Sequence, residues 1–434
     1  MQNEKEKTIK KVMWRLLPIA MLLFFFSLLD RTNISFAALE MNKDLALSPS
    51  QYGTAAGIFF LGYVLFEIPS NFVLARVGAR IWLARIMVTW GLVTVAMAFV
   101  QGTASLYSVR FLLGVAEAGL LPGLLLYMGL WLPARERGVA YATLLATPAI
   151  AYAVGAPFTT LLMQISAFGL KGWQIMFIIQ GGLTVAVGLM TLALLPSKVS
   201  EASWLNNDEK NVLTDLLDAD FAAKKVAGVT STKQGFLDPR VLLSAALCFA
   251  IVCANFGTVL WLPQIVRSIF PALNLVQISL LISLAFIIGG IIGIFVGKSS
   301  DKKGDRKWHL VACTLVGVVG FVIAGYASVA EIKFAGVCVG ILGIWSTFGV
   351  FWAYNGDLLG GSGAVGGLAF VNSVGSIGGF IAPMVLAYGL EKAGGMHGAL
   401  FALAAFSVAA GILATLIRPL SQSQAVPATA PVAL

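Results

Sequence analysis

Long apolar stretches separated by short polar segments recur along the whole chain of 434 residues. Most are close to the roughly 20 residues that an α-helix needs to cross the hydrocarbon core of a bilayer. The pattern therefore predicts an all-α membrane protein with twelve transmembrane helices. We expect these helices at about 13–36, 51–74, 82–101, 105–131, 139–163, 173–195, 240–266, 275–297, 309–328, 332–356, 364–388 and 398–417.

The composition excludes two other classes of protein. Hydrophobic residues make up 59% of the chain, and charged residues only 11%. An average soluble protein carries about a quarter charged residues, so an ordinary water-soluble enzyme is excluded. A disordered chain is excluded as well, because such chains are poor in aliphatic and aromatic residues.

The net charge of +9 has two possible meanings, a nucleic-acid partner or basic loops on one side of a membrane. With the N-terminus placed inside, 22 of the 29 Lys and Arg residues fall on the inner side and five on the outer side. The other two, Arg31 and Arg110, lie within predicted helices. This distribution predicts a multi-pass protein of a bacterial inner membrane with both termini in the cytoplasm, and no nucleic-acid partner.

One long polar segment divides the chain. We interpret 197–238 as a cytoplasmic amphipathic linker, because leucines recur in it at helical spacing among charged residues. It separates an N-terminal half, 1–196, from a C-terminal half, 239–418. The last residues, 419–434, are rich in Ser, Ala and Pro and are predicted to be a disordered tail.

The two halves share a weak internal repeat. At an offset of 226 residues, Gly78 aligns with Gly304 and Arg80 aligns with Arg306. Two pseudo-symmetric six-helix halves are typical of secondary transporters.

The repeated segment carries a recognisable motif. Its second copy reads GxxxDxxGxR, with Gly297, Asp301, Gly304 and Arg306, and resembles the loop motif of the major facilitator superfamily. The first copy has Arg76, Gly78 and Arg80, but Ala75 stands where the motif has Asp. The resemblance covers about 15–418 and implies alternating access around a central cavity, with these residues as a gating motif whose salt bridges are weaker in the first half.

Four ionisable residues lie deep in predicted helices, where each costs roughly 2.5–3.5 kcal/mol and usually faces a cavity. They are Asp30, Arg31, Arg110 and Glu117. Arg110 and Glu117 are two turns apart on one helix face, so they are candidates for a structural ion pair, and Arg110 could also extend towards the outer interface. Glu67 precedes Pro69 near the cytoplasmic side, which favours a role in anchoring helix packing over a direct role in function.

These charges support a chemical hypothesis. A guanidinium group matches a carboxylate geometrically and stays charged, whereas a buried carboxylate can take up and release a proton near neutral pH. Protonation of an acid would then release its arginine to bind a substrate anion. Two alternatives stay open: proton-driven drug efflux, which needs neither arginine, and a membrane-bound sensor or enzyme, which needs a soluble domain larger than any segment present.

The strings SLLDRTNISFA (27–37), FFLGYVLFEIPSNFVLARVGARIWLARIMVTWG (59–91) and RFLLGVAEAGLLPG (110–123) resemble the anion:cation symporter family, which includes permeases for tartrate, phthalate, sugar acids and hydroxyphenylacetate. The resemblance implies proton-coupled uptake of an organic carboxylate. It also implies that Asp30 and Glu117 are protonation sites, that Arg31 and Arg110 bind carboxylate, and that Tyr63 lines the cavity.

In the second half, the segment FVNSVGSIGGFIAP again resembles this family, whose equivalent of Asn372 contacts substrate. Ser376 shares a helix face with Asn372. We expect Trp352 and Asn355 to contribute as well, and the aromatic residues around Trp352 favour an aromatic or compact carboxylate over a sugar acid. Asp357 is expected to cap its helix or to gate.

The remaining reactive residue types give no sign of an enzyme. The four cysteines all lie in apolar stretches without a CxxC pair, and the two histidines lie at the ends of segments, so no metal site is expected. No Gly-rich nucleotide-binding motif ending in Lys is present, which argues against ATP as the energy source. We expect no cofactor, a proton as coupling ion, and a monomer in the lipid bilayer.

Overall fold

The computed structural model describes residues 2–226, 238–358 and 364–417. The predicted tail at 419–434 and the last part of the predicted linker lie outside the described residues.

The described residues are almost entirely helical, and twelve helical segments are long and apolar enough to cross a membrane, so the predicted fold class is confirmed. The elements are α1 (Gln2–Asp44), α2 (Pro49–Val77), α3 (Ala79–Ala96), η1 (Met97–Phe99), α4 (Thr103–Glu117), α5 (Leu120–Trp131), α6 (Ala134–Leu144), α7 (Thr147–Leu162), α8 (Gly172–Leu194), η2 (Val199–Glu201), α9 (Asn207–Val226), α11 (Pro239–Ile269), α12 (Leu275–Lys303), α13 (Lys307–Tyr326), α14 (Ala330–Leu358), α15 (Ala364–Lys392) and α16 (Met396–Leu416).

Two of the predicted helices are each divided into two pieces. The ring of a proline clashes with the carbonyl group four residues earlier. Pro122 accounts in this way for the break between α4 and α5, where Gly119 has a φ of 91°, and Pro148 for the end of α6 at Leu144. The first break leaves Glu117 as the last residue of α4.

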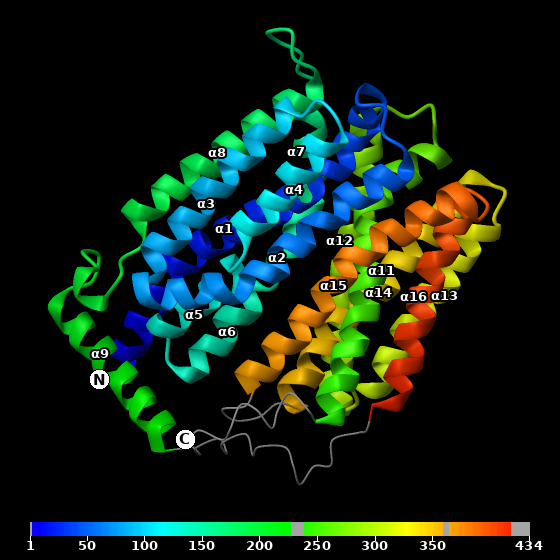
Figure 1. The fold of residues 1–434 in the computed structure, drawn as a ribbon. Helices are drawn as coiled ribbons and strands as arrows, with labels where there is room; N and C mark the ends of the chain where they lie inside the picture. Colours follow the sequence, from blue (N-terminus) through cyan, green and yellow to red (C-terminus); the bar gives the residue numbers. More distant parts are fainter. Residues whose placement is uncertain (1, 227–237, 359–363, 418–434) are drawn as a thin grey trace. The chain divides into compact units, whose positions relative to one another are not determined.

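The helices group into two compact units. Unit 1 comprises Met1–Gly228 and Leu273–Ser283, and unit 2 comprises Val229–Ala272 and Leu284–Leu434, so α12 contributes to both. In unit 1, α1 packs against α7 and α8, α3 against α8, and α2 against α4. In unit 2, α13 packs against α14 and α16, and α11 against α15 (Figure 1).

Backbone contact between α2 and α4 is unusually close. A Cβ atom at Gly114 would lie 2.0 Å from the carbonyl oxygen of Phe59, and one at Gly62 would lie 2.4 Å from that of Phe111. Small residues allow transmembrane helices to approach in this way. The approach brings the side chains of α4 within reach of the backbone of α2.

The segment after α8 folds back onto unit 1 near the start of α1 (Figure 1). Lys11 pairs with Glu209 at 2.7 Å, and Arg137 pairs with Asp220 at 2.7 Å. The hydrogen bonds from Lys11 and from the backbone of Asn206 lower the pKa of the Glu209 carboxyl group. Leu213 and Leu217 of α9 are buried among exposed polar side chains, so the helix is amphipathic.

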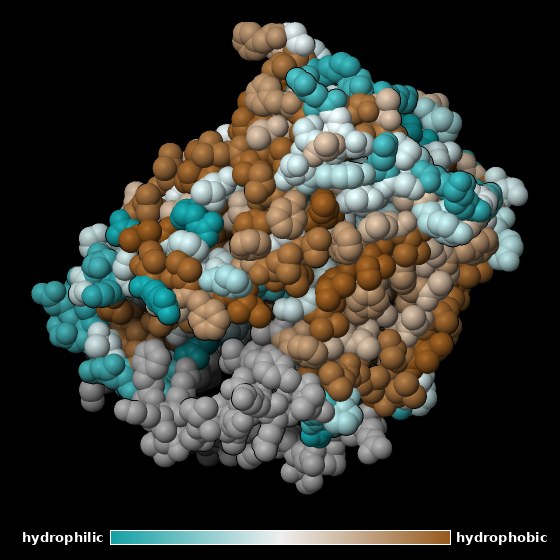
Figure 2. Space-filling view, viewed as in Figure 1, coloured by the Kyte–Doolittle hydropathy of each residue, from teal (hydrophilic) through white to brown (hydrophobic). Residues whose placement is uncertain are grey.

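The flanks of the helices expose large apolar side chains, among them Leu280, Ile294 and Phe295. Figure 2 shows apolar side chains over much of the visible face, with hydrophilic side chains gathered towards its ends. A soluble monomer rarely exposes so much contiguous apolar surface. These exposed apolar side chains are suited to contact with the hydrocarbon core of a membrane instead of with water.

Candidate functional site

The four ionisable residues predicted within helices come together in unit 1, on α1 and α4. Asp30, Arg110 and Glu117 are at most 3% exposed, and the side chain of Arg31 is 14% exposed. Two cations and two carboxylates therefore share the interior of one helical unit.

Glu117 pairs with Arg31 through one carboxylate oxygen. Its Oε1 atom accepts hydrogen bonds from Arg31 Nε at 2.7 Å and from Ser27 Oγ at 2.7 Å, and it lies 2.6 Å from Arg31 Nη2. Its Oε2 atom is buried and has no hydrogen-bond partner. Oε1 of the Glu117 carboxylate therefore makes the ion pair, and Oε2 is without a hydrogen-bond donor.

The predicted ion pair of Arg110 with Glu117 is wrong, and so is the alternative in which Arg110 extends to the interface. Arg110 is fully buried and turns towards α2, where Nε donates to the Ala55 carbonyl at 3.1 Å and Nη2 to the Ala56 carbonyl at 3.3 Å. The close approach of α2 makes these carbonyls available. The Nη1 atom has no partner, which leaves a buried cation with an unused donor.

Asp30 is surrounded by neutral donors. Its Oδ1 atom accepts from Asn33 Nδ2 at 2.6 Å, and its Oδ2 atom accepts from Thr94 Oγ1 at 2.9 Å and from Trp90 Nε1. Asn33, Trp90 and Thr94 are all buried. Three donors satisfy an ionised carboxylate without an adjacent cation.

Aromatic side chains of α2 complete the group. The guanidinium carbon of Arg31 lies 4.8 Å from the ring centroid of Tyr63 and 5.6 Å from that of Phe59. The same Phe59 ring lies 5.1 Å from the guanidinium carbon of Arg110. Tyr63 is thus beside the ion pair, and Phe59, which was not predicted from the sequence, contacts both arginines through cation–π interactions.

Sequence analysis also missed the neutral polar partners Ser27, Trp90, Thr94 and Gln180. Each is a polar side chain in an apolar helix, and each is buried. Hydroxyl, amide and indole side chains on the same helix faces as the charged residues are the sequence signal that could have identified them, because buried polar groups pair with one another.

The predicted substrate residues of unit 2 lie on α14 and α15. Asn355 is fully buried, with its Oδ1 atom accepting from Ser244 Oγ at 2.5 Å and its Nδ2 atom donating to the Phe351 carbonyl at 2.9 Å. Those are the contacts of a packing residue in this conformation. Ser376 Oγ donates to the backbone carbonyl of Asn372 at 2.9 Å.

Trp352 is only partly buried and packs edge-on against Phe351, with ring centroids 5.3 Å apart. Trp345 and Phe286 make a similar contact at 5.2 Å. Unit 2 therefore offers aromatic side chains. In its described part, the arginines within spans are Arg240 and Arg267, which lie near the two ends of α11, unlike Arg31 and Arg110 in unit 1.

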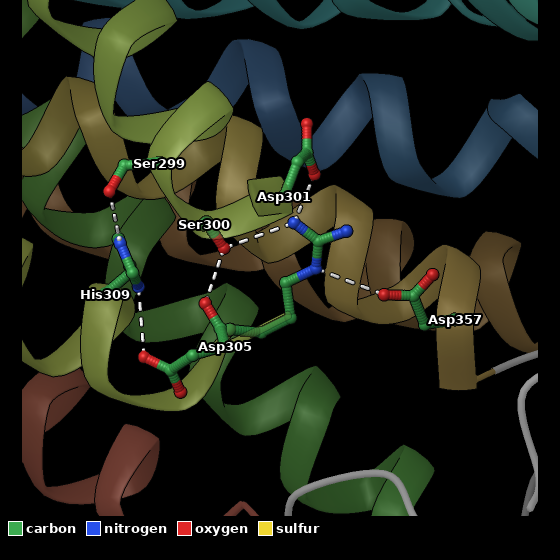
Figure 3. A network of polar contacts seen from close by, with 7 residues as sticks. Ser299, Ser300, Asp301, Asp305, His309 and Asp357 are labelled. Atoms are coloured by element: carbon green, nitrogen blue, oxygen red, sulfur yellow. Dashed lines mark hydrogen bonds and ion pairs between the residues drawn. The ribbon is translucent and has the colours of Figure 1, made fainter. Parts of the chain in front are cut away.

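The second copy of the loop motif is held by Arg306 (Figure 3). Its Nε atom donates to Asp357 Oδ2 at 3.1 Å, and its Nη1 atom donates to Ser300 Oγ at 3.1 Å and to Asp301 Oδ1. Partial burial lowers the pKa of Arg306, but the two carboxylates outweigh it and raise that pKa above its usual value. Arg306 therefore joins the end of α12 to the end of α14.

A second chain of contacts in Figure 3 runs through His309, which lies 3.0 Å from Asp305 Oδ2 and 3.1 Å from Ser299 Oγ. Gly304, with a φ of 63°, allows the turn between α12 and α13, and a Cβ at Gly297 would meet open space.

The first copy of the motif is built differently. Gly78, with a φ of 95°, separates α2 from α3, and Arg76 is exposed. Arg80 donates to the Leu192 carbonyl and lies 3.9 Å from Glu201. In the absence of an aspartate at position 75, this arginine contacts the end of α8 and the segment that follows it.

The described residues hold no group of three or more His, Cys, Asp or Glu side chains arranged to bind a metal ion. All four cysteines are unpaired, and three of them are buried. The candidate site is thus made of ion pairs, hydrogen bonds and aromatic rings.

The sequence model of the Major Facilitator Superfamily matches residues 20–383. The chain therefore belongs to this superfamily of membrane transporters: it is a multi-pass membrane protein that carries a small molecule and is not an enzyme.

Individual relatives agree with this assignment, and a solved structure has the same fold. The chain is 39% identical to a protein of Agrobacterium vitis named "Putative tartrate transporter", over 94% of each chain. It is 35% identical to a "Quinolone resistance transporter" of Acinetobacter baumannii, over 93% of each. The crystal structure of a bacterial homologue of the human lysosomal transporter Spinster, inward-facing and unoccupied, matches with a TM-score of 0.76 at 16% identity, over 94% of this chain and 96% of that one.

Proposed function

We propose that the protein takes up an organic dicarboxylate together with protons across a bacterial inner membrane, by alternating access. Asp30 and Glu117 carry the protons, and Arg31 and Arg110 bind the carboxylate groups. The observation that carries this proposal is the one-sided ion pair of Glu117, in which Oε1 holds all of the donors and Oε2 holds none.

This geometry allows proton binding and arginine release to be one event. A proton can bind to Glu117 Oε2 without first breaking a hydrogen bond. The pair with Arg31 then loses its charge, and a buried guanidinium without a counter-charge is costly. A substrate carboxylate supplies the missing negative charge and matches the fork of the guanidinium group.

The charges of the four buried residues lead to an expected number of protons per substrate molecule. Arg31 and Arg110 balance Asp30 and Glu117 when both acids are ionised. A bound dicarboxylate adds two negative charges, which protonation of both acids would offset. We expect about two protons per dicarboxylate, because uncompensated charge in a low-dielectric interior is strongly unfavourable.

The substrate class follows from the two arginines and from the relatives. Two guanidinium groups that both contact the ring of Phe59 suit a compact molecule with two carboxylates, and an Agrobacterium vitis relative is named for tartrate. Tyr63, Trp352, Asn372, Ser376 and Asn355 remain proposed substrate residues. The motif residues on both loops are proposed to gate, the termini to be cytoplasmic, and the protein to be monomeric.

Proton-driven drug efflux is the second candidate. The Acinetobacter baumannii relative favours it. It predicts a cationic or neutral apolar cargo, which gains nothing from a buried arginine whose Nη1 atom has no partner. We therefore rank it below the uptake of an acid.

Uptake into proteoliposomes tests the choice. With an inward proton gradient, compact dicarboxylates such as tartrate should accumulate above their external concentration, and aromatic monocarboxylates and sugar acids should accumulate less. Dissipating the gradient should remove the accumulation. Export of cationic drugs by the same vesicles, with no acid accumulated, would establish efflux instead.

A further inference from the structure

A chain of neutral polar side chains leads away from Asp30 through the core of unit 1. Asn33 Nδ2 donates to Asp30 Oδ1 at 2.6 Å and to Gln180 Oε1 at 3.2 Å. Gln180 Nε2 then donates to Thr159 Oγ1 at 2.9 Å. The chain thus runs from α1 through α8 to α7, and Asn33, Gln180 and Thr159 are each at most 1% exposed.

The direction of the hydrogen bonds is fixed by the charge on Asp30. Both hydrogen atoms of the Asn33 amide are used, one for the carboxylate and one for Gln180. The Oδ1 atom of Asn33 is buried and has no partner. Asn33 and Gln180 therefore both donate in the order that an ionised Asp30 requires.

Protonation of Asp30 conflicts with this order. Asp30 Oδ1 would become a hydroxyl group facing the Asn33 amide hydrogens, and two donors cannot bond to each other. If the Asn33 amide turns over, its oxygen atom faces Gln180 Oε1, so Gln180 must turn as well. Thr159 must then donate its hydroxyl hydrogen to Gln180 instead of accepting a bond from it.

The reversed chain is less favourable in this conformation. The Asn33 NH₂ group would occupy the place where its oxygen atom has no partner, and a buried unsatisfied donor costs roughly 1–3 kcal/mol. Of the described residues, the charged groups acting on Asp30 are Arg110 and Glu117 of α4, whereas α3 and α8 present neutral groups.

We propose that Asn33 and Gln180 are positioning residues for proton coupling, forming an amide relay whose hydrogen bonds reverse when Asp30 is protonated. The relay transmits the state of Asp30 to α7 and favours the present packing of α1, α7 and α8 only while Asp30 is ionised. This inference rests on the proposed function, because it takes Asp30 as a proton carrier.

The test is infrared spectroscopy of the full-length protein in proteoliposomes as the pH is varied. The carbonyl band of a protonated Asp30 is identified as the band missing in Asp30→Asn. In Gln180→Met, Asn33 can turn over without the reversal of Gln180 and Thr159, so the midpoint of this band should move to higher pH by about half a unit to one unit, the equivalent of one lost hydrogen bond. Thr159→Val, which removes the far end of the relay, should move it in the same direction and serves if Gln180→Met does not fold.

Thr184→Val is the matched control. Thr184 lies on α8, is 1% exposed and donates to the backbone carbonyl of Gln180, not to its side chain. The variant therefore removes a buried hydrogen bond outside the relay. Its midpoint should equal that of the wild type. If Gln180→Met and Thr159→Val both leave the midpoint unchanged, the relay is refuted, but the role of Asp30 as a proton carrier is not. If no band is missing in Asp30→Asn, both the relay and the role of Asp30 are refuted.

Discussion

Replacing Glu117 by glutamine is expected to lower proton-driven accumulation of the substrate by at least about 100-fold. Glutamine keeps an oxygen atom for Ser27 and Arg31 but cannot exchange a proton. Arg31 is then held by a neutral partner at every pH and stays available to the substrate. Exchange of labelled for unlabelled substrate across the membrane should therefore continue, within about threefold of the wild-type rate, and should lose the part of its pH dependence that Glu117 contributes, while the part due to Asp30 remains.

The exchange assay also verifies that the variant is folded. The same substitution at Glu209, whose pair with Lys11 is partly exposed, is the control. Exposed pairs contribute about 0–1 kcal/mol, so Glu209→Gln should accumulate substrate like the wild type. If Glu117→Gln accumulates substrate to the same ratio of internal to external concentration as the wild type, Glu117 is not part of the coupling mechanism.

Replacing Arg110 by lysine should raise the KM for a dicarboxylate by at least about 30-fold, or about 2 kcal/mol. Lysine keeps the positive charge and can bond to the carbonyls of Ala55 and Ala56. It lacks the planar fork and the Nη1 donor that has no partner in this conformation. Initial uptake rates over a range of substrate concentrations measure the change.

Arg85→Lys is the control for this variant. Arg85 is a partly buried arginine of unit 1 whose guanidinium carbon lies 3.8 Å from the ring centroid of Trp82, and its Nε atom is also without a partner. It lies in the first turns of α3, apart from the group on α1 and α4. A KM that rises equally in both variants would mean that Arg110 acts through the general packing of unit 1 instead of by binding the substrate.

The helices could be predicted from the sequence because a spanning segment must be both long and apolar, a requirement that no tertiary contact overrides. The breaks after Glu117 and Leu144 were not predicted. Their cause is visible in Pro122 and Pro148, but Pro69 and Pro263 lie inside continuous helices. Whether a proline breaks a transmembrane helix depends on neighbours that can satisfy the freed carbonyl group, and the sequence does not give them.

The candidate site was predicted in its residues but not in its pairing. Helical spacing puts Arg110 and Glu117 on one face, and this suggested an ion pair. The long side chain of Arg110 instead reaches the carbonyls of α2, which lies close because Gly62 and Gly114 have no side chain. Arg31 is thereby the partner of Glu117. Pairing depends on the approach of separate helices, and one helix face cannot reveal it.

The most direct test of the central claim is the movement of protons when substrate is added to proteoliposomes of the wild-type protein at equal pH on both sides. Dicarboxylate added outside should acidify the interior, with about two protons entering per dicarboxylate and no net transfer of charge. Dicarboxylate uptake that leaves the internal pH unchanged would contradict the account.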